Sequence, residues 1–167
     1  SEQFYETVLR TLGVEQTHKD DEFTEWNTFL LAQADGGQPP TRRLHIGFVA
    51  PSRAHVDEFW RAGTAAGYRD DGPPGPRPQY SEDYYGAFLL DPDGNSAEAV
   101  HHGSVRDGSV IDHLWLRVTD VAASTRLVST RAWISAPSAS ATLGAAISPV
   151  TRAPSRTSMI SVAVIRP

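Results

Sequence analysis

The chain has 167 residues, of which 40% are hydrophobic, and a formal net charge of −5. This length suits one packed domain with a short extension, and the acidic balance argues against a nucleic-acid partner, which needs clustered Lys and Arg. The absence of cysteine excludes disulfides and thiolate ligands, so a metal ion can be held only by imidazole and carboxylate groups. No apolar run reaches the roughly 18 residues that cross a membrane, and residues 1–5 lack the pattern of a signal peptide. We therefore expect a cytoplasmic protein without a membrane partner.

The first part of the chain predicts two helices and several strands. Residues 2–12 place apolar side chains at helical spacing before a glycine stop signal, which indicates an amphipathic helix. Residues 22–33 are rich in aromatic and branched side chains, and we expect one or two strands there. Residues 44–50 predict a short apolar strand with one histidine, and Ser52 caps a helix expected over about residues 53–66.

The central region predicts a loop, a hairpin and a further strand. The prolines of residues 70–78 remove amide donors and fix φ, so we expect a loop without regular structure. Residues 84–90 and 97–101 read as strands on either side of the turn sequence DPDGN at residues 91–95, which predicts a β-hairpin. Residues 111–118 (IDHLWLRV) alternate in the manner of another strand.

The chain changes character near residue 120. Residues 1–120 contain all 20 acidic residues and 10 of the 15 basic ones, whereas residues 121–167 contain five Arg and no acidic residue. Residues 124–156 also lack a sustained period of 2 or 3.6, and residues 158–165 suit a strand. We interpret the Ser/Ala/Arg-rich tail 125–167 as a degenerate third unit or as an abnormal terminus, such as one from out-of-frame translation.

The first 124 residues contain an internal repeat of a strand, a helix and about three strands. Residues 42–103 form a complete unit, whereas residues 1–41 begin at the helix and lack the opening strand. The counterpart of that strand lies within residues 110–124. There Asp-His-Leu (112–114) repeats the pattern of Leu-His-Ile (44–46) in the complete unit. Strand 111–118 therefore either completes the first unit within the chain or is exchanged with a second chain.

Four motifs of the chain belong together: LHIGF (44–48), VDEF (56–59), YYGAF (84–88) and DPDGNSAEAV (91–100). The last is the most specific, because no general stability rule requires Glu three residues after its turn. Together they resemble one βαβββ module of the vicinal oxygen chelate superfamily, which comprises glyoxalases, bleomycin-resistance proteins and extradiol dioxygenases. The resemblance covers about residues 1–124. It implies an α+β fold of paired βαβββ modules, with the opening strand of the first module displaced to residues 111–118.

In that superfamily a metal ion lies in a cup between two modules, held by residues of the first and last strand of each. The resemblance implies that His45 and Glu98 are metal ligands from the complete module and that His113 is the matching ligand from the other. The remaining position falls on Leu30, so we expect three protein ligands for a divalent ion such as Fe, Mn, Zn or Ni. Two imidazoles and one carboxylate leave open positions for water and a bidentate substrate.

The residue pattern alone supports these ligands less specifically. His45 lies between two apolar residues of a strand and faces away from them, and Glu98 lies likewise between two alanines. A strand histidine taken alone is more often a satisfied or exposed residue than a ligand. His101 and His102 face opposite sides of a strand, so at most one can reach the cup, and exposed positions are favoured for both.

Two functions fit the sequence. The first is a metal-dependent enzyme that chelates a small substrate through vicinal oxygens, as a lyase, isomerase or dioxygenase, with Glu98 as the candidate catalytic base. The second is a metal-free protein of the bleomycin-resistance type that sequesters a ligand between aromatic groove walls, for which Trp26 and Trp115 are candidates.

Two further residues are candidate substrate contacts. One of Tyr84 and Tyr85 faces the pocket, and we assign Tyr85 to it, with a core position as the alternative. Arg77 suits an anionic substrate if its loop borders the pocket, and the alternative is that the loop is only a connector. We expect a homodimer, because a half-module with exposed sheet edges needs a partner.

Overall fold

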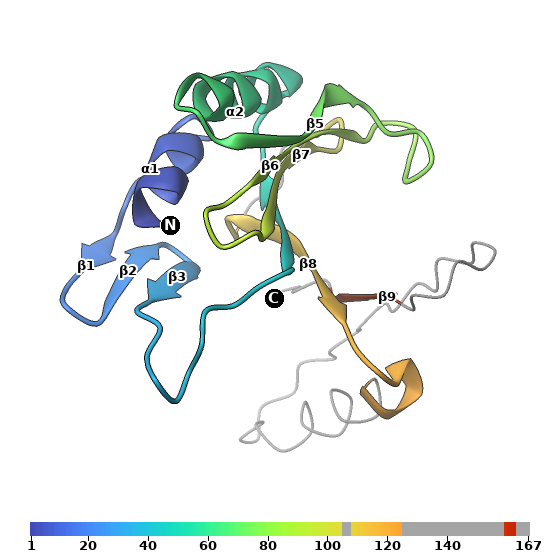
Figure 1. Cartoon of the computed structure of the whole chain (residues 1–167). Coiled ribbons are helices and arrows are strands. Elements are labelled where there is room, and N and C mark those ends of the chain that lie inside the picture. The colour runs from blue at the N-terminus through green and yellow to red at the C-terminus, as the bar shows by residue number, and fades with distance from the viewer. Residues whose placement is uncertain (105–107, 125–158, 163–167) are drawn as a thin grey trace, which may run out of the picture.

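The computed structural model describes residues 1–104, 108–124 and 159–162, and the prediction for the rest of the tail lies outside the described residues. The fold is mixed α+β, as the sequence predicts, and the described residues form one three-stranded and one six-stranded sheet (Figure 1). Among the described residues, no helix has the length and apolar character that a bilayer span needs.

The first module is a helix followed by a small antiparallel sheet. Helix α1 (Glu2–Arg10) is followed by β1 (His18–Lys19), β2 (Phe23–Trp26) and β3 (Phe29–Ala32), which are neighbours in that order. One face of α1 is buried, as its helical spacing of apolar residues requires. No described strand precedes α1.

The second module contains every element of the repeat. It comprises β4 (His45–Val49), α2 (Arg53–Ala65), β5 (Arg69–Pro76), β6 (Tyr85–Leu90) and β7 (Ser96–His101). The strands are ordered β5-β6-β7-β4, with β4 parallel to β7 and the other pairs antiparallel. Alternate residues of β4 and β7 are buried in the core, which leaves their neighbours on the opposite face of the sheet.

The prediction of a loop at residues 70–78 is wrong. These residues fall largely in β5, which pairs antiparallel with β6 from Arg69 to Pro76. Because β5 is the edge strand, a proline there can leave its missing amide on the solvent side without removing a bond of the sheet interior. The register also shifts twice, between Asp70 and Gly72 and between Gly72 and Gly75, and such irregularities accommodate the unpaired residues.

The displaced strand β8 (Ile111–Arg117) joins the sheet of the complete module. It lies antiparallel to β4 on the side away from β7, and not beside the three-stranded sheet. Strand β9 (Met159–Val162) coincides with the strand predicted within residues 158–165 and pairs antiparallel with β8. Within this chain, β8 therefore forms a second wall beside the complete module.

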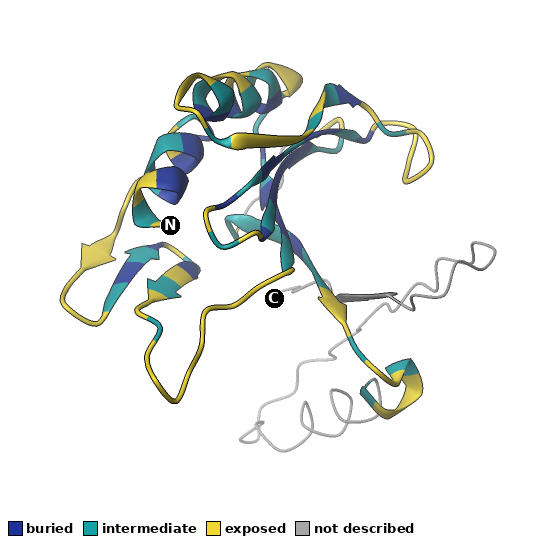
Figure 2. Ribbon diagram, in the orientation of Figure 1, coloured by how far each residue is buried: buried dark blue, intermediate teal, exposed yellow. Residues whose placement is uncertain are grey.

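An aromatic core joins the two modules. The ring of Phe29 in β3 lies 4.7 Å from that of Tyr5 in α1 and 5.2 Å from that of Phe48 in β4, measured between centroids. Trp26 and Phe59 are fully buried in the same cluster. Figure 2 shows this buried layer between the helices and the sheet, which fixes α1 and the small sheet against β4.

The DPDGN turn connects three parts of the chain through buried hydrogen bonds. The side chain of Asp91 accepts the amides of Asp93 and Asn95 at 2.9 and 2.8 Å, and it also accepts the Tyr5 hydroxyl at 3.0 Å. Asn95 accepts the amide of Leu44 at 3.0 Å through its side-chain oxygen. The turn between β6 and β7 therefore holds both α1 and the start of β4, which explains why its sequence is so specific.

Candidate metal centre

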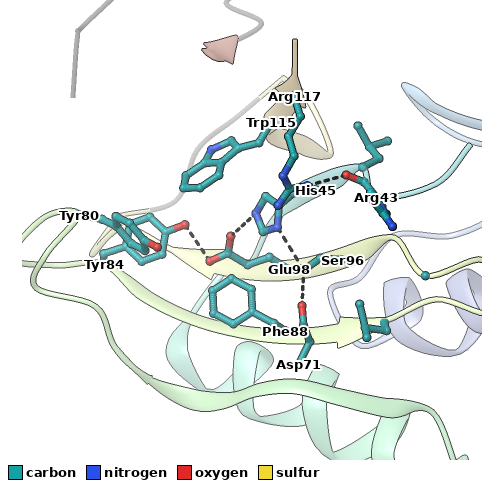
Figure 3. A pocket seen from close by; sticks show the side chains of 13 residues that line it. Arg43, His45, Asp71, Tyr80, Tyr84, Phe88, Ser96, Glu98, Trp115 and Arg117 are labelled. Atoms are coloured by element: carbon teal, nitrogen blue, oxygen red, sulfur yellow. Dashed lines mark hydrogen bonds and ion pairs between the residues drawn. The ribbon is translucent and has the colours of Figure 1, made fainter. Parts of the chain in front are cut away.

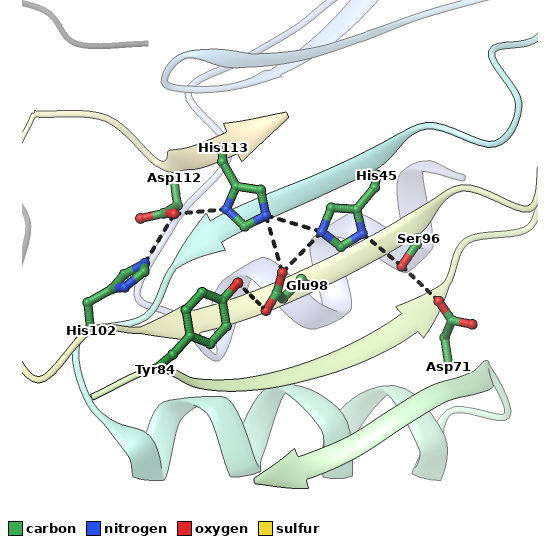
Figure 4. A network of polar contacts seen from close by, with 8 residues as sticks. All are labelled: His45, Asp71, Tyr84, Ser96, Glu98, His102, Asp112 and His113. Carbon is green, nitrogen blue, oxygen red and sulfur yellow. Dashed lines mark hydrogen bonds and ion pairs between the residues drawn. The ribbon is translucent and has the colours of Figure 1, made fainter. Parts of the chain in front are cut away.

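Three side chains from three neighbouring strands converge on one point. His45 Nε2 lies 3.0 Å from Glu98 Oε2 and 3.2 Å from His113 Nε2, and His113 Nε2 lies 3.3 Å from the same oxygen of Glu98 (Figure 4). Glu98 is 1% exposed and His113 is 8% exposed, whereas His45 is partly accessible. The three residues that the sequence singled out as metal ligands thus lie together in space.

The register of the sheet explains this convergence. Gly47 of β4 is paired with Glu98 on β7 and with His113 on β8, so all three residues share one face of the sheet. His45 lies two residues before Gly47 and faces the same side. Because β8 pairs with β4, it supplies the third donor.

Two glycines make room for the donors. A Cβ on Gly47 would lie 2.4 Å from Cε1 of His113, and a Cβ on Gly86 would lie 2.5 Å from Oε1 of Glu98. Neither glycine has a positive φ, so what each position requires is the absence of a side chain. Sequence reasoning missed this role, although both glycines stand inside the motifs LHIGF and YYGAF.

The Nδ1 atom of His45, which points away from the centre, begins a short chain of hydrogen bonds. Its Nδ1 lies 3.2 Å from the hydroxyl oxygen of Ser96, and that hydroxyl donates to Asp71 Oδ2 at 2.8 Å. Since the hydroxyl proton is directed to Asp71, Ser96 is left to accept from Nδ1 of His45. When an ion is bound, this contact would keep the His45 proton on Nδ1 and leave the lone pair of Nε2, the nitrogen that faces the centre, for the metal.

Asp112 determines which ring nitrogen of His113 faces the centre with a lone pair. Its Oδ1 lies 2.8 Å from His113 Nδ1 and 3.3 Å from His102 Nε2. A carboxylate only accepts hydrogen bonds, so Nδ1 of His113 carries a proton and Nε2 is the nitrogen available to a metal. His102, for which the sequence favoured an exposed position, is half-buried and supports this carboxylate.

The second oxygen of Glu98 is held by Tyr84. The Tyr84 hydroxyl donates to Glu98 Oε1 at 2.7 Å. Burial and the charge of Glu98 raise the pKa of Tyr84 well above its usual value, so the hydroxyl remains a donor. Burial also raises the pKa of Glu98, but hydrogen bonds from His113 and His45 and their charge hold it below its usual value. Glu98 is therefore an ionised acceptor despite its burial.

Without an ion, a proton lies among the three donors. Burial alone would lower the pKa of His113, but hydrogen bonds to Asp112 and Glu98 and the charges of these carboxylates raise it to about 9. Protonated His113 then neutralises the buried Glu98. A divalent ion would have to displace this proton before it could bind.

The three donors fit a divalent metal. Bonds of about 2.0–2.2 Å at tetrahedral or octahedral angles place neighbouring ligand atoms roughly 3–3.5 Å apart, and the three separations are 3.0, 3.2 and 3.3 Å. Two neutral imidazole nitrogens and a carboxylate oxygen are also ligands that iron, manganese, zinc and nickel accept. The His45, Glu98 and His113 set is thus a candidate site for such an ion.

The candidate site opens into a cavity of about 570 Å³. Figure 3 shows its floor, where His45 and Glu98 lie, and its walls, which include Tyr80, Trp115 and Phe88. The cavity is large enough for a small-molecule ligand.

The structure places the two candidate substrate contacts, Tyr85 and Arg77, outside the lining of this cavity. Tyr85 points to the helical side of the sheet, where its hydroxyl donates to Asp57 at 2.9 Å, and Tyr84 takes the cavity side instead. Arg77 donates to the carbonyls of Pro73 and Pro76 and stacks over Phe88, outside the cavity lining. The difference arises because β6 begins at Tyr85, and strand alternation then sends Tyr85 to the face opposite Gly86 and Phe88.

Of the remaining candidates, one lies in the cavity wall and two do not. Trp115 lines the cavity beside His45. Trp26 is fully buried in the aromatic core. Leu30, the position matching a fourth ligand, lies on β3, is 52% exposed and does not line this cavity.

The chain belongs to the Glyoxalase/Bleomycin resistance protein/Dioxygenase superfamily, whose family model matches residues 1–99. This confirms the resemblance to the vicinal oxygen chelate superfamily. His45 and Glu98 lie inside the matched residues, whereas His113 and β8 lie beyond them.

Two solved structures are similar to this chain. A glyoxalase/bleomycin resistance protein from Albidiferax ferrireducens T118 is 33% identical, with a TM-score of 0.53 over 59% of this chain and 85% of that one. A lactoylglutathione lyase from Agrobacterium tumefaciens is 23% identical, with a TM-score of 0.43 over 59% of this chain and 81% of that one. A comparison with curated proteins finds no match.

Proposed function

We propose that the chain is a metal-dependent enzyme that binds a small substrate through two adjacent oxygen atoms. The observation that carries this proposal is the convergence of His45, Glu98 and His113, with donor atoms 3.0–3.3 Å apart. Two of the three, His45 and Glu98, also line a cavity of about 570 Å³. A divalent ion held there would act as a Lewis acid toward the two substrate oxygens. Iron, manganese, zinc and nickel all suit the donor set.

The surrounding residues prepare the three donors for this role. Ser96 and Asp112 direct the free lone pairs of the two histidines toward one point, so little reorganisation is needed when an ion binds. The Tyr84 hydroxyl occupies Oε1 of Glu98, which leaves Oε2 directed at the histidines. The glycines at positions 47 and 86 keep the space open.

Glu98 is also the candidate base for the reaction. Lyase and isomerase reactions of vicinal oxygen compounds need a carboxylate beside the metal to accept a substrate proton. Glu98 is ionised and lies at the cavity floor, whereas the other carboxylate of the lining, Asp71, already accepts from Ser96. Dioxygenase chemistry at the same three ligands would require iron or manganese.

A second candidate function is metal-free ligand sequestration of the bleomycin-resistance type. It is favoured by the hydrogen bonds among His45, Glu98 and His113, which satisfy all three side chains without an ion. The aromatic wall of Tyr80, Phe88 and Trp115 suits the binding of a flat ligand. In this case Glu98 and the histidines would be a structural ion pair.

A cobalt titration separates the two functions. Co²⁺ bound to His45, Glu98 and His113 gives visible absorption bands that depend on its coordination, and acetohydroxamate is a small ligand with two vicinal oxygens. The enzyme proposal predicts one Co²⁺ per chain and a change in these bands when acetohydroxamate is added. Absence of visible bands at saturating Co²⁺ would favour ligand sequestration instead.

We further propose that the protein is a cytoplasmic homodimer, in which β8 either stays in its own chain or is exchanged. The support is that β3 is an edge strand of the three-stranded sheet and exposes Leu30. We also propose the division into a partial module (1–41), a complete module (42–103), a displaced strand (110–124) and a separate tail (125–167). Light scattering of the purified chain tests the dimer, and a monomeric mass would contradict it.

A further inference from the structure

One end of the cavity carries two arginines. Arg43 precedes β4 and Arg117 ends β8, and both line the same cavity as His45 and Glu98 (Figure 3). His113, Trp115 and Arg117 alternate along β8, so one face of this strand presents a metal donor, an aromatic ring and a guanidinium in succession.

These arginines have no carboxylate partner in the described part of the chain. None of the ion pairs found there includes Arg43 or Arg117. The two carboxylates of the lining are engaged elsewhere, because Asp71 accepts from Ser96 and Glu98 lies between the histidines. The arginine end of the cavity therefore carries positive charge that no ion pair with a described residue neutralises.

The Arg117 guanidinium is also held in position. Its Nη1 donates to the carbonyl oxygen of Arg43 at 2.8 Å, which uses one of its five N–H donors. Arg43 has a φ of +59°, a conformation that residues with a side chain rarely adopt and that places its carbonyl within reach of Arg117. A planar guanidinium fixed in this way presents its remaining donors in the arrangement that a carboxylate accepts.

Aromatic rings lie between the arginines and the metal donors. The ring centroids of Trp115 and Phe88 lie 5.2 and 5.9 Å from that of His45, and Tyr80 meets Trp115 edge-on at 6.1 Å. Two residues of a strand span about 7 Å, so Arg117 begins about that far beyond Trp115. A ligand that reaches both ends must therefore have an apolar middle.

We propose that the cavity binds a small carboxylate whose flat apolar middle lies against Trp115 and whose carboxylate is bound by Arg117, assisted by Arg43. The opposite end carries the two vicinal oxygens that face His45, Glu98 and His113. Only this oxygen end rests on the proposed metal-dependent function. The arginine end is independent of any metal.

A matched pair of probes tests the proposal. The first probe is 3-(3,4-dihydroxyphenyl)propanoate, which has vicinal oxygens, an aromatic ring and a carboxylate, and the second is its uncharged primary amide. Affinities are measured by calorimetry without oxygen, for the protein with and without added Zn²⁺. The proposal predicts that the carboxylate binds roughly 5- to 10-fold more tightly than the amide in both states, and that added KCl reduces this preference.

Two variants localise the effect. Arg117→Gln should reduce the preference to less than about twofold. The fold should tolerate this change, because the Arg117 side chain is exposed and its loss leaves no buried group unpaired. Arg42→Gln is the control, since Arg42 is an exposed neighbouring arginine outside the cavity lining, and it should keep the full preference.

The outcomes distinguish the two proposals. Equal affinities for the two probes in the wild-type protein, no binding of either probe, or a preference that Arg117→Gln leaves intact would each overturn the carboxylate site. If Zn²⁺ does not bind but the preference persists, the carboxylate site stands and the metal-dependent function fails. If Zn²⁺ binds but the preference for the carboxylate probe is absent, the metal site stands and the carboxylate site fails.

Discussion

Substitution of Gly47 by alanine should displace His113 and weaken metal binding. The added Cβ would lie 2.4 Å from Cε1, 2.6 Å from Nδ1 and 3.0 Å from Nε2 of the His113 ring. These distances are about 1 Å shorter than an ordinary contact. The ring cannot yield freely, because Asp112 holds its Nδ1 at 2.8 Å and Glu98 lies 3.3 Å from its Nε2.

The expected magnitudes follow from this overlap. Overpacking of this kind destabilises the metal-free protein by about 1–3 kcal/mol. Loss of a residue that only supports a ligand weakens metal binding by roughly 10- to 100-fold. Displacement of a ligand itself should therefore weaken Zn²⁺ binding by roughly 100-fold. Chemical denaturation and calorimetric titration measure the two effects. Gly36→Ala is the control, because no atom lies within 4 Å of its added Cβ.

A double-mutant cycle decides whether the His113 ring is the cause. In a His113→Ala protein the ring is absent, so Gly47→Ala should change the free energy of unfolding by less than about 0.5 kcal/mol. An equal destabilisation by Gly47→Ala in both backgrounds would refute the reasoning. The requirement for glycine at position 47 would then come from backbone strain and not from the space that the His113 ring needs.

Three further predictions concern the surroundings of the centre. Ser96→Ala and Asp112→Asn should each weaken Zn²⁺ binding by about 10- to 100-fold, because the histidines lose the partners that orient them. A calorimetric titration measures this, and unchanged affinity in both variants would contradict the orienting role of Ser96 and Asp112. Since the pKa of His113 is raised to about 9 and its proton must leave, Zn²⁺ affinity should rise up to about 10-fold per pH unit from pH 7 toward pH 9. The released proton should make the measured binding enthalpy depend on the ionisation enthalpy of the buffer, and a flat affinity profile would count against this prediction. Asn95→Ala should lower the free energy of unfolding, measured by urea denaturation, by about 2–3 kcal/mol, because the Leu44 amide and Asp91 lose their hydrogen-bond partner. A loss below about 0.5 kcal/mol would show that the turn does not hold β4.

Much of the fold could be predicted because its signals are local. The helical spacing of residues 2–12, the DPDGN turn and the alternation of residues 111–118 each specify an element without reference to the rest of the chain. The proline-rich strand β5 could not be predicted in this way. Whether its missing amides matter depends on its position at the sheet edge, and a sheet's strand order is not a local property.

The candidate site was predictable in part for the same reason. His45 and Glu98 lie on strands of one module whose alternation and motifs are visible in the sequence. The choice between Tyr84 and Tyr85 required knowledge of where β6 begins, since a shift of one residue reverses the face. Asp71 could not be found, because its link to Ser96 joins the edge strand to a central one across 25 residues.

The central claim is that His45, Glu98 and His113 hold one metal ion. The most direct test is the metal content of the purified protein after loading with Zn²⁺ and removal of the excess, measured by elemental analysis. The account predicts one ion per chain in the wild-type protein and its loss in His45→Ala, Glu98→Ala and His113→Ala, with Gly36→Ala unchanged. Stoichiometric metal in all three ligand variants would contradict it.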